Sequence, residues 1–323
     1  MSPVARARTS VIATAAVALA ALGCASESSS QGFEEPVRVV GGQFVEGELP
    51  GLPPAAPGLE VSPYVTAAQN AGGVFAYGDP KRDISGRATD DAVSVAFGFE
   101  GIGSGYWLVP MRGIDPTNPG EFTFAFTAEF SRSIPAGIHR VLFAAINGKE
   151  ESGTQHRVEF CRLSEIPDNG NACSSAIAPP ALVVSLDWDR EVDLDLQVYT
   201  PDGVLVDAKH PSTAPDEDGT GEPGVGTFGL DSNAGCVIDG RRRENLVFQE
   251  PPASGTYYAY VNLFGACGQD STRFNVTLNA PVEDAESGTF DQKETYRTSG
   301  ILTAPQANGG ANVGLFVTSF VVP

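Results

Sequence analysis

Apolar side chains recur at every second position along much of the chain, and this alternation predicts short β-strands. Over residues 93–99 and 122–126, valine and phenylalanine alternate with smaller or polar residues. A period of two places one side of a strand against a core. By the same criterion, further strands of the first half are expected at 36–46, 106–111, 138–146 and 156–162.

The alternation resumes after the adjacent Pro179 and Pro180. In residues 182–188 and 194–198, large apolar side chains share one face of each expected strand. Asp187 and Asp195 lie on the opposite faces, and Asp189 and Asp193 directly flank the two strands. Glycine (37 residues) and proline (24 residues) punctuate the whole chain, and no segment keeps a helical period for long. Other strands of the second half are expected at 204–208, 226–231, 245–249, 256–264, 272–279, 288–297 and 313–322.

These two blocks of strands predict an all-β protein with two β-sandwich domains, either immunoglobulin-like or jelly-roll. The N-terminal sandwich is expected at 36–178. The second sandwich, with C-terminal strands added, is expected at 181–323. The two prolines between the blocks predict a stiff joint.

The first residues of the chain predict export. A cationic start with Arg6 and Arg8 is followed by an apolar run of about 12 residues, which is shorter than the roughly 20 that a membrane-spanning helix needs. The run ends in Ala-Leu-Gly-Cys, which resembles the lipobox of bacterial lipoproteins. The resemblance implies a signal peptide at 1–23 and a lipidated Cys24. An ordinary signal peptide with an incidental cysteine is the alternative.

The segment that follows the cysteine is polar and predicts a flexible tether over 24–35. Two or more acyl chains anchor a protein stably, so the membrane is an expected partner. Ala25 stands where some lipoproteins carry aspartate. By resemblance to Gram-negative sorting rules, this favours the outer membrane and an extracytoplasmic location.

Composition changes the picture by excluding one class of partner. Removal of residues 1–23 takes away two of the 20 basic residues and none of the 40 acidic ones, which leaves a charge of −22. Binding to nucleic acid needs clustered lysine and arginine against phosphates, so no nucleic-acid partner is expected.

The cysteines fit an oxidising compartment. If Cys24 carries lipid, Cys161, Cys173, Cys236 and Cys267 remain, and an even number in an exported chain predicts two disulfides. Four cysteines allow three pairings. We favour Cys161 with Cys173 and Cys236 with Cys267, because each pair is local to one predicted domain.

Residues 181–280 resemble a known family. The run from Leu186 to Gly203, the segment Gly226-Thr-Phe-Gly-Leu-Asp-Ser-Asn-Ala-Gly-Cys236, Glu244-Asn245, and the stretch from Pro252 to Val261 occur in the order found in the YfaP-like domain. This is a bacterial family of exported β-rich proteins without established biochemistry. The resemblance implies a β-rich fold outside the cytoplasm and no particular reaction. The family often has histidine where Gln197 stands, so no role of that histidine is carried over.

The acidic cluster is the strongest candidate for chemistry. Four aspartates within nine residues are expected on two neighbouring strand ends, where their charges repel unless they are solvated or bridged by a cation. Calcium, which binds six to eight oxygen atoms, is the candidate cofactor. A solvated acidic face with turn caps is the alternative. The candidate ligands are Asp187, Asp189, Asp193, Asp195, Asp231 and Asn233.

A second candidate feature is an aromatic stretch in the strand at 256–264. Tyr258, Tyr260 and Phe264 fall on one face and Tyr257 on the other, so part of the set points outward. Such rings either complete a core or, when exposed, stack on sugars or contact a protein.

No arrangement typical of nucleophilic catalysis occurs, since Gly-x-Ser-x-Gly and His-Glu-x-x-His are both missing from the sequence. We therefore expect no enzyme. The leading hypothesis is a non-catalytic cell-envelope lipoprotein that acts as a surface binding or adhesion module for an unidentified protein or carbohydrate, supported by calcium. The alternatives are a structural envelope protein without a specific ligand and a carboxylate-based hydrolase.

Overall fold

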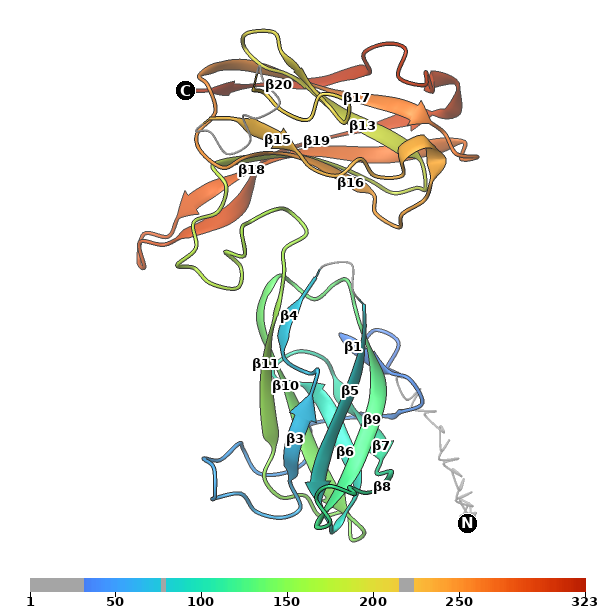
Figure 1. Ribbon diagram of the computed structural model, residues 1–323, viewed down its shortest axis with the longest axis vertical. Helices are drawn as coiled ribbons and strands as arrows, with labels where there is room; N and C mark the ends of the chain where they lie inside the picture. Colours follow the sequence, from blue (N-terminus) through green and yellow to red (C-terminus); the bar gives the residue numbers. More distant parts are fainter. Residues whose placement is uncertain (1–31, 77–79, 215–223) are drawn as a thin grey trace, which may run out of the picture. The chain divides into compact units, whose positions relative to one another are not determined.

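The computed structural model describes residues 32–76, 80–214 and 224–323. Over these residues the chain forms strands and two short 3-10 turns, with no α-helix (Figure 1). The predicted all-β fold is therefore confirmed. The predicted signal peptide, Cys24 and most of the tether lie outside the described residues.

The strands between residues 37 and 162 form two facing sheets, referred to here as the first sandwich. All of their pairs are antiparallel except that of β4 with β11. One sheet consists of β1 (Val37–Val39), β9 (Glu121–Phe130), β5 (Lys81–Thr89) and β3 (Val65–Gln69), with β8 (Gly113–Ile114) beside β9. The other consists of β2 (Gln43–Glu46), β7 (Gly105–Pro110), β6 (Ala92–Phe99), β10 (Gly137–Asn147), β11 (His156–Arg162) and β4 (Gly73–Phe75).

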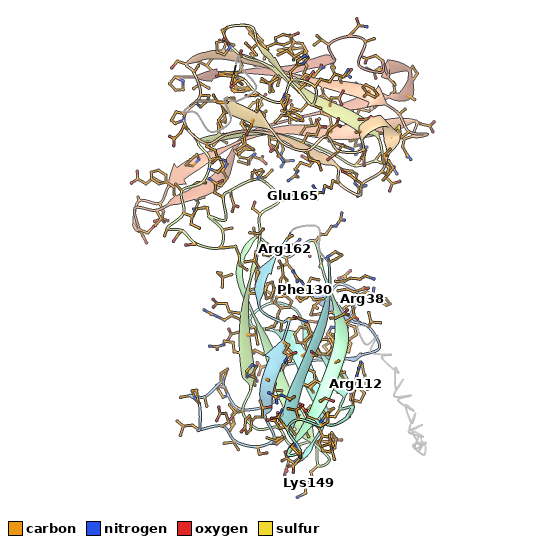
Figure 2. The ribbon with its side chains drawn as sticks, viewed as in Figure 1. Arg38, Arg112, Phe130, Lys149, Arg162 and Glu165 are labelled. Carbon is orange, nitrogen blue, oxygen red and sulfur yellow. A yellow bond between two sulfur atoms is a disulfide. The ribbon has the colours of Figure 1, made fainter. Side chains whose placement is uncertain are left out.

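The core of the first sandwich is rich in phenylalanine. Phe130 points between the sheets, and its ring meets that of Phe75 edge-on with centroids 5.0 Å apart (Figure 2). Phe97 and Phe124 are fully buried, as the alternation predicted. Burial of each such ring stabilises the fold by roughly 1.5–3 kcal/mol.

The strands between residues 182 and 322 form a second sandwich. Its five-stranded sheet has the order β15 (Gly226–Phe228), β16 (Arg243–Phe248), β12 (Leu182–Trp188), β18 (Ser271–Glu283) and β19 (Phe290–Thr303). Its four-stranded sheet has the order β14 (Leu205–Val206), β13 (Asp193–Tyr199), β17 (Gly255–Gly265) and β20 (Leu315–Val322). The 3-10 turns are η1 (Ala234–Cys236) and η2 (Ala304–Gln306).

Consecutive strands β12 and β13 belong to opposite sheets of the second sandwich. Leu186 on β12 and Leu194 and Leu196 on β13 are completely buried in one core. That core contains only residues from 182 onward, and the core of the first sandwich contains only residues up to 160. Each sandwich therefore buries its own apolar side chains.

Both expected disulfides form, between Cys161 and Cys173 and between Cys236 and Cys267. Disulfides persist in oxidising compartments, so they indicate an extracytoplasmic protein. Among the described residues, no helix is long and apolar enough to cross a membrane.

Candidate metal centre

Strand β13 places two aspartates on one face of the four-stranded sheet. Its sequence alternates aspartate with leucine, and the leucines at 194 and 196 are fully buried. Because successive side chains of a strand point to opposite faces, Asp193 and Asp195 share the face that points away from the core. Asp231 reaches the same place from the loop that follows β15.

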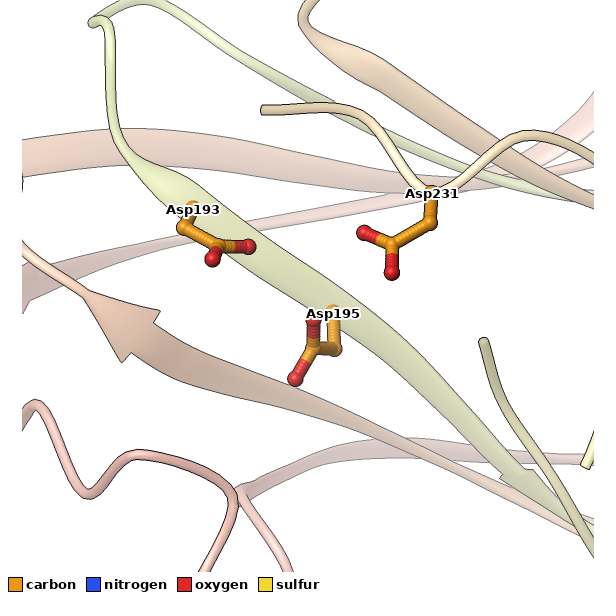
Figure 3. Close-up of side chains that lie close together, drawn as sticks. All are labelled: Asp193, Asp195 and Asp231. Atoms are coloured by element: carbon orange, nitrogen blue, oxygen red, sulfur yellow. The ribbon is translucent and has the colours of Figure 1, made fainter. Parts of the chain in front are cut away.

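These three residues form an acidic triad. One carboxylate oxygen from each lies within 4.8 Å of the other two, and Figure 3 shows the carboxyl groups of Asp193 and Asp231 turned toward each other with Asp195 beside them. Among the described residues, this is the one group of three or more acids, histidines or cysteines that could hold a metal ion. Asp193 is buried, Asp195 is partly buried and Asp231 is exposed.

Asp193 has a buried oxygen atom without a partner. The side chain is 1% exposed, and its Oδ2 accepts a hydrogen bond of 2.6 Å from the backbone N–H of Gly235. The N–H of Cys236 lies near the carboxylate and lowers its pKa, but no donor in the described part of the chain has hydrogen-bond geometry at Oδ1. A buried polar atom that has neither water nor a donor costs about 1–3 kcal/mol, and more when it is charged. A cation or a proton bound at this oxygen would offset that cost.

Asn262 lies directly opposite Asp195 on β17. Its Nδ2 donates a hydrogen bond of 3.1 Å to Asp195 Oδ2, which orients that carboxylate. The side chain of Asn262 is 1% exposed, and its Oδ1 also has no donor among the described residues. The site thus contains two buried oxygens without donors.

Burial and mutual repulsion raise the pKa of the acids. Burial is the largest cause for Asp193, whose pKa rises to about 6, and the charge of Asp195 adds to it. Burial also raises the pKa of Asp195 to about 6, against the hydrogen bond from Asn262. The pKa of Asp231 is raised too, first by burial and then by the charges of Asp239 and Asp207. A cation at the triad would reverse these shifts, because opposite charge favours ionisation.

Glu244 on β16 lies in the core next to the triad. It is fully buried, and its two oxygens accept hydrogen bonds from the backbone N–H groups of Leu196 at 2.7 Å and Ser232 at 3.3 Å. Burial raises the pKa of this carboxyl group well above its usual range. Because the two N–H groups belong to the residues directly after Asp195 and Asp231, Glu244 fixes the positions of two members of the triad.

A disulfide holds the loop that covers the buried end of the triad. Cys236 ends the turn η1, which carries the N–H of Gly235, and its bond to Cys267 joins that turn to the end of β17. Gly265 faces Asp193 across the strands, where a Cβ atom would lie 3.0 Å from Cys236 Sγ. A side chain at this position would therefore crowd the disulfide.

The triad opens into a cavity of about 570 Å³ at the surface of the four-stranded sheet. Asp207 adds a fourth acid to its wall, and Lys209 adds a cation whose Nζ lies 5.6 Å from the centre of the Phe264 ring. Gln197 and the loop at 310–313 also line it. The cavity is therefore acidic at one end, and its other walls mix polar, aromatic and apolar residues.

The structure does not bring the other proposed ligands into the triad. The sequence hypothesis placed β12 and β13 side by side, which is wrong, because the turn between them crosses from one sheet to the other. Asp187 accepts a hydrogen bond of 2.9 Å from Asn275 Nδ2, and Asp189 accepts one of 2.9 Å from the N–H of Arg273. Both aspartates satisfy partners on the five-stranded sheet instead.

Asn233 also has a structural role. Its Nδ2 donates to the backbone oxygen of Val192 at 3.0 Å, and its Oδ1 accepts from the N–H of Asp239 at 3.1 Å.

Sequence reasoning missed Glu244, although a signal was present. Glu244 alternates in phase with Leu246 and Phe248, which places an acid on the core face of a strand.

No family model and no curated protein matches the chain. Among solved structures, dimeric latent PorU from Porphyromonas gingivalis matches 83% of this chain at 10% identity, with a TM-score of 0.22. The match spans 20% of the PorU chain. The C-terminal domain of the AgI/II polypeptide BspA from Streptococcus agalactiae matches 81% of this chain and 98% of its own at 8% identity, with a TM-score of 0.17. Similarities this weak carry no argument about function.

Proposed function

We propose that the second sandwich is a calcium-binding module of an exported, lipid-anchored cell-envelope protein that acts by binding rather than catalysis. The observation that carries this proposal is the buried, unpartnered Oδ1 of Asp193 next to the carboxylates of Asp195 and Asp231. Three carboxylates converge there from two separate segments of the chain, and a bound cation would offset their repulsion.

The chemistry of the ligands selects the cation. All side-chain ligands in the triad are oxygen atoms, and no cysteine or histidine belongs to it. Zinc sites in proteins use thiolate and imidazole ligands, whereas calcium takes six to eight oxygens at 2.3–2.6 Å in a flexible arrangement. Magnesium requires near-ideal octahedral geometry and keeps several waters. A site whose three carboxylates range from buried to exposed suits calcium, since water or a ligand can complete the coordination on the exposed side.

The remaining parts of the proposal rest on the start of the chain and on the disulfides. The lipobox-like sequence ending at Cys24 supports lipid anchoring, and the two disulfides agree with a position outside the cytoplasm. The resemblance of residues 181–280 to the YfaP-like domain is in keeping with an exported β-rich module. Extracellular modules bind calcium with dissociation constants of about 10⁻⁴–10⁻³ M, and we expect this site to fall in that range.

Isothermal titration of calcium into the chain beginning at Ala25 tests the proposal. We expect one calcium ion per chain, and loss of binding in Asp195→Asn, which keeps the shape of the side chain and removes its charge. Asp187→Asn is the matched control, because Asp187 lies on the other sheet and accepts one hydrogen bond from Asn275. No binding by the parent chain, or equal losses in both variants, would contradict a site at the triad.

A further inference from the structure

A row of aromatic rings begins beside the acidic triad and continues along the same face of the four-stranded sheet. Strands β13 and β17 pair Asp195 with Asn262, then Gln197 with Tyr260, and then Tyr199 with Tyr258. Successive pairs on one face are about 7 Å apart. The triad and the rings are therefore neighbouring parts of one surface, and Gln197 also lines the cavity that contains the triad.

The rings contact one another, and they are exposed at Tyr258 and Phe316 and partly exposed at Tyr199 and Tyr260. Tyr260 meets Tyr199 edge-on with centroids 5.8 Å apart, and meets Phe316 of β20 edge-on at 5.5 Å. Phe316 is 51% exposed and Tyr258 is 43% exposed. The inward-facing Tyr257, by contrast, is 1% exposed and donates its hydroxyl to the backbone oxygen of Ala253. The hydroxyls of Tyr258 and Tyr260 make no hydrogen bond to any described residue.

We infer that this surface binds a neutral polysaccharide, with sugar rings on Tyr260 and Phe316 and sugar hydroxyls completing the coordination of calcium at the triad. The inference rests on the proposed calcium site and names its ligand class. Aromatic rings present flat apolar faces with polar rims, which match the two sides of a sugar ring. Calcium takes six to eight oxygens, so the triad leaves positions that hydroxyl groups of a ligand can fill.

Charge and neighbouring groups favour a glycan over an acidic or strongly apolar partner. The expected charge of −22 repels anionic polymers, and the cavity contains four aspartates against one lysine. Beside the rings, Ser319 of β20, which pairs with Tyr258, adds an exposed hydroxyl. This hydroxyl and those of Tyr258 and Tyr260 suit a ligand that is rich in hydroxyls.

Affinity gel electrophoresis of the chain beginning at Ala25 tests the inference, with mannan, dextran or galactan in the gel and calcium in the buffer. We expect at least one of the three polysaccharides to retard the protein. Tyr260→Ala should lower the apparent affinity about tenfold, since one aromatic contact contributes up to about 1.5 kcal/mol. Phe290→Ala is the matched control, because it removes a ring of 44% exposure from the other sheet.

Removal of calcium with EDTA, or Asp195→Asn, should abolish the retardation. The inference is overturned if none of the three polysaccharides retards the protein, if Tyr260→Ala binds like the parent chain, or if retardation persists in EDTA. If the surface captures a protein through Tyr260 and binds none of the polysaccharides, it is a protein-binding surface, and the inference is also overturned. Calcium titration of the same sample separates the two proposals. Calcium binding without retardation refutes the glycan alone, whereas absence of calcium binding refutes the proposed function.

Discussion

Without calcium, the second sandwich should lose stability as the pH rises from about 4 to about 7. The pKa of Asp193 and that of Asp195 rise to about 6 from a usual value of 3.8. Between these limits the folded state binds more protons than the unfolded state, so the free energy of unfolding falls with increasing pH. For one group, a rise of the pKa from 3.8 to about 6 corresponds to about 3 kcal/mol.

Asp195→Asn removes one of these charges and keeps an acceptor for Asn262. In EDTA at neutral pH, the variant should therefore be more stable than the parent chain by about 2–3 kcal/mol. Calcium at about a hundred times its dissociation constant should add about 3 kcal/mol to the parent chain and nothing to the variant. The advantage of the variant should then disappear.

Urea unfolding followed by fluorescence measures both effects. The chain has two tryptophans, Trp107 in the core of the first sandwich and Trp188 in the core of the second. In a Trp107→Phe background, the fluorescence reports the second sandwich alone. The reasoning is refuted if stability in EDTA increases over this pH range, or if Asp195→Asn is less stable than the parent chain at neutral pH without calcium.

Three further predictions concern the parts that support the site. Glu244→Gln leaves one of the N–H groups of Leu196 and Ser232 without an acceptor. It should therefore weaken calcium binding in the titration, and unchanged affinity would show that Glu244 does not position the triad. Replacement of Cys236 and Cys267 by serine should cost about 4 kcal/mol, on a loop-closure estimate for a separation of 31 residues, and lower calcium affinity. The same replacement at Cys161 and Cys173 should leave calcium affinity unchanged, and equal losses would argue against a local effect. Finally, cells that produce the full chain should incorporate labelled palmitate, and Cys24→Ser should abolish the label; a labelled variant would contradict lipidation at that residue.

The all-β class and most of the strands followed from alternating apolar residues. The strand at Lys81–Thr89 was missed because its inward positions include Gly86 and Ala88, which add little to an apolar pattern. Gly86 is required there, since a Cβ atom would lie 2.3 Å from the ring of Phe124. The ring of Phe124, directly opposite on the neighbouring strand of the same sheet, thus requires a small residue, which conceals the strand in the sequence.

The acidic site was predictable only in part. The spacing of Asp193 and Asp195 places them on one face of a strand, and this follows from the sequence alone. Whether β12 pairs with β13 or crosses to the other sheet depends on tertiary packing, because both strands alternate in the same way. The crossing separates Asp187 and Asp189 from the triad, whereas the candidate Asp231 joins it from the loop after β15.

A crystal structure of the chain grown in calcium tests the central claim most directly. We expect a cation bound by oxygens of Asp193, Asp195 and Asp231 at about 2.3–2.6 Å, with Asp193 Oδ1 among its ligands. Anomalous scattering identifies the ion as calcium. An ion elsewhere on the chain with the three carboxylates bound to water alone would contradict the account.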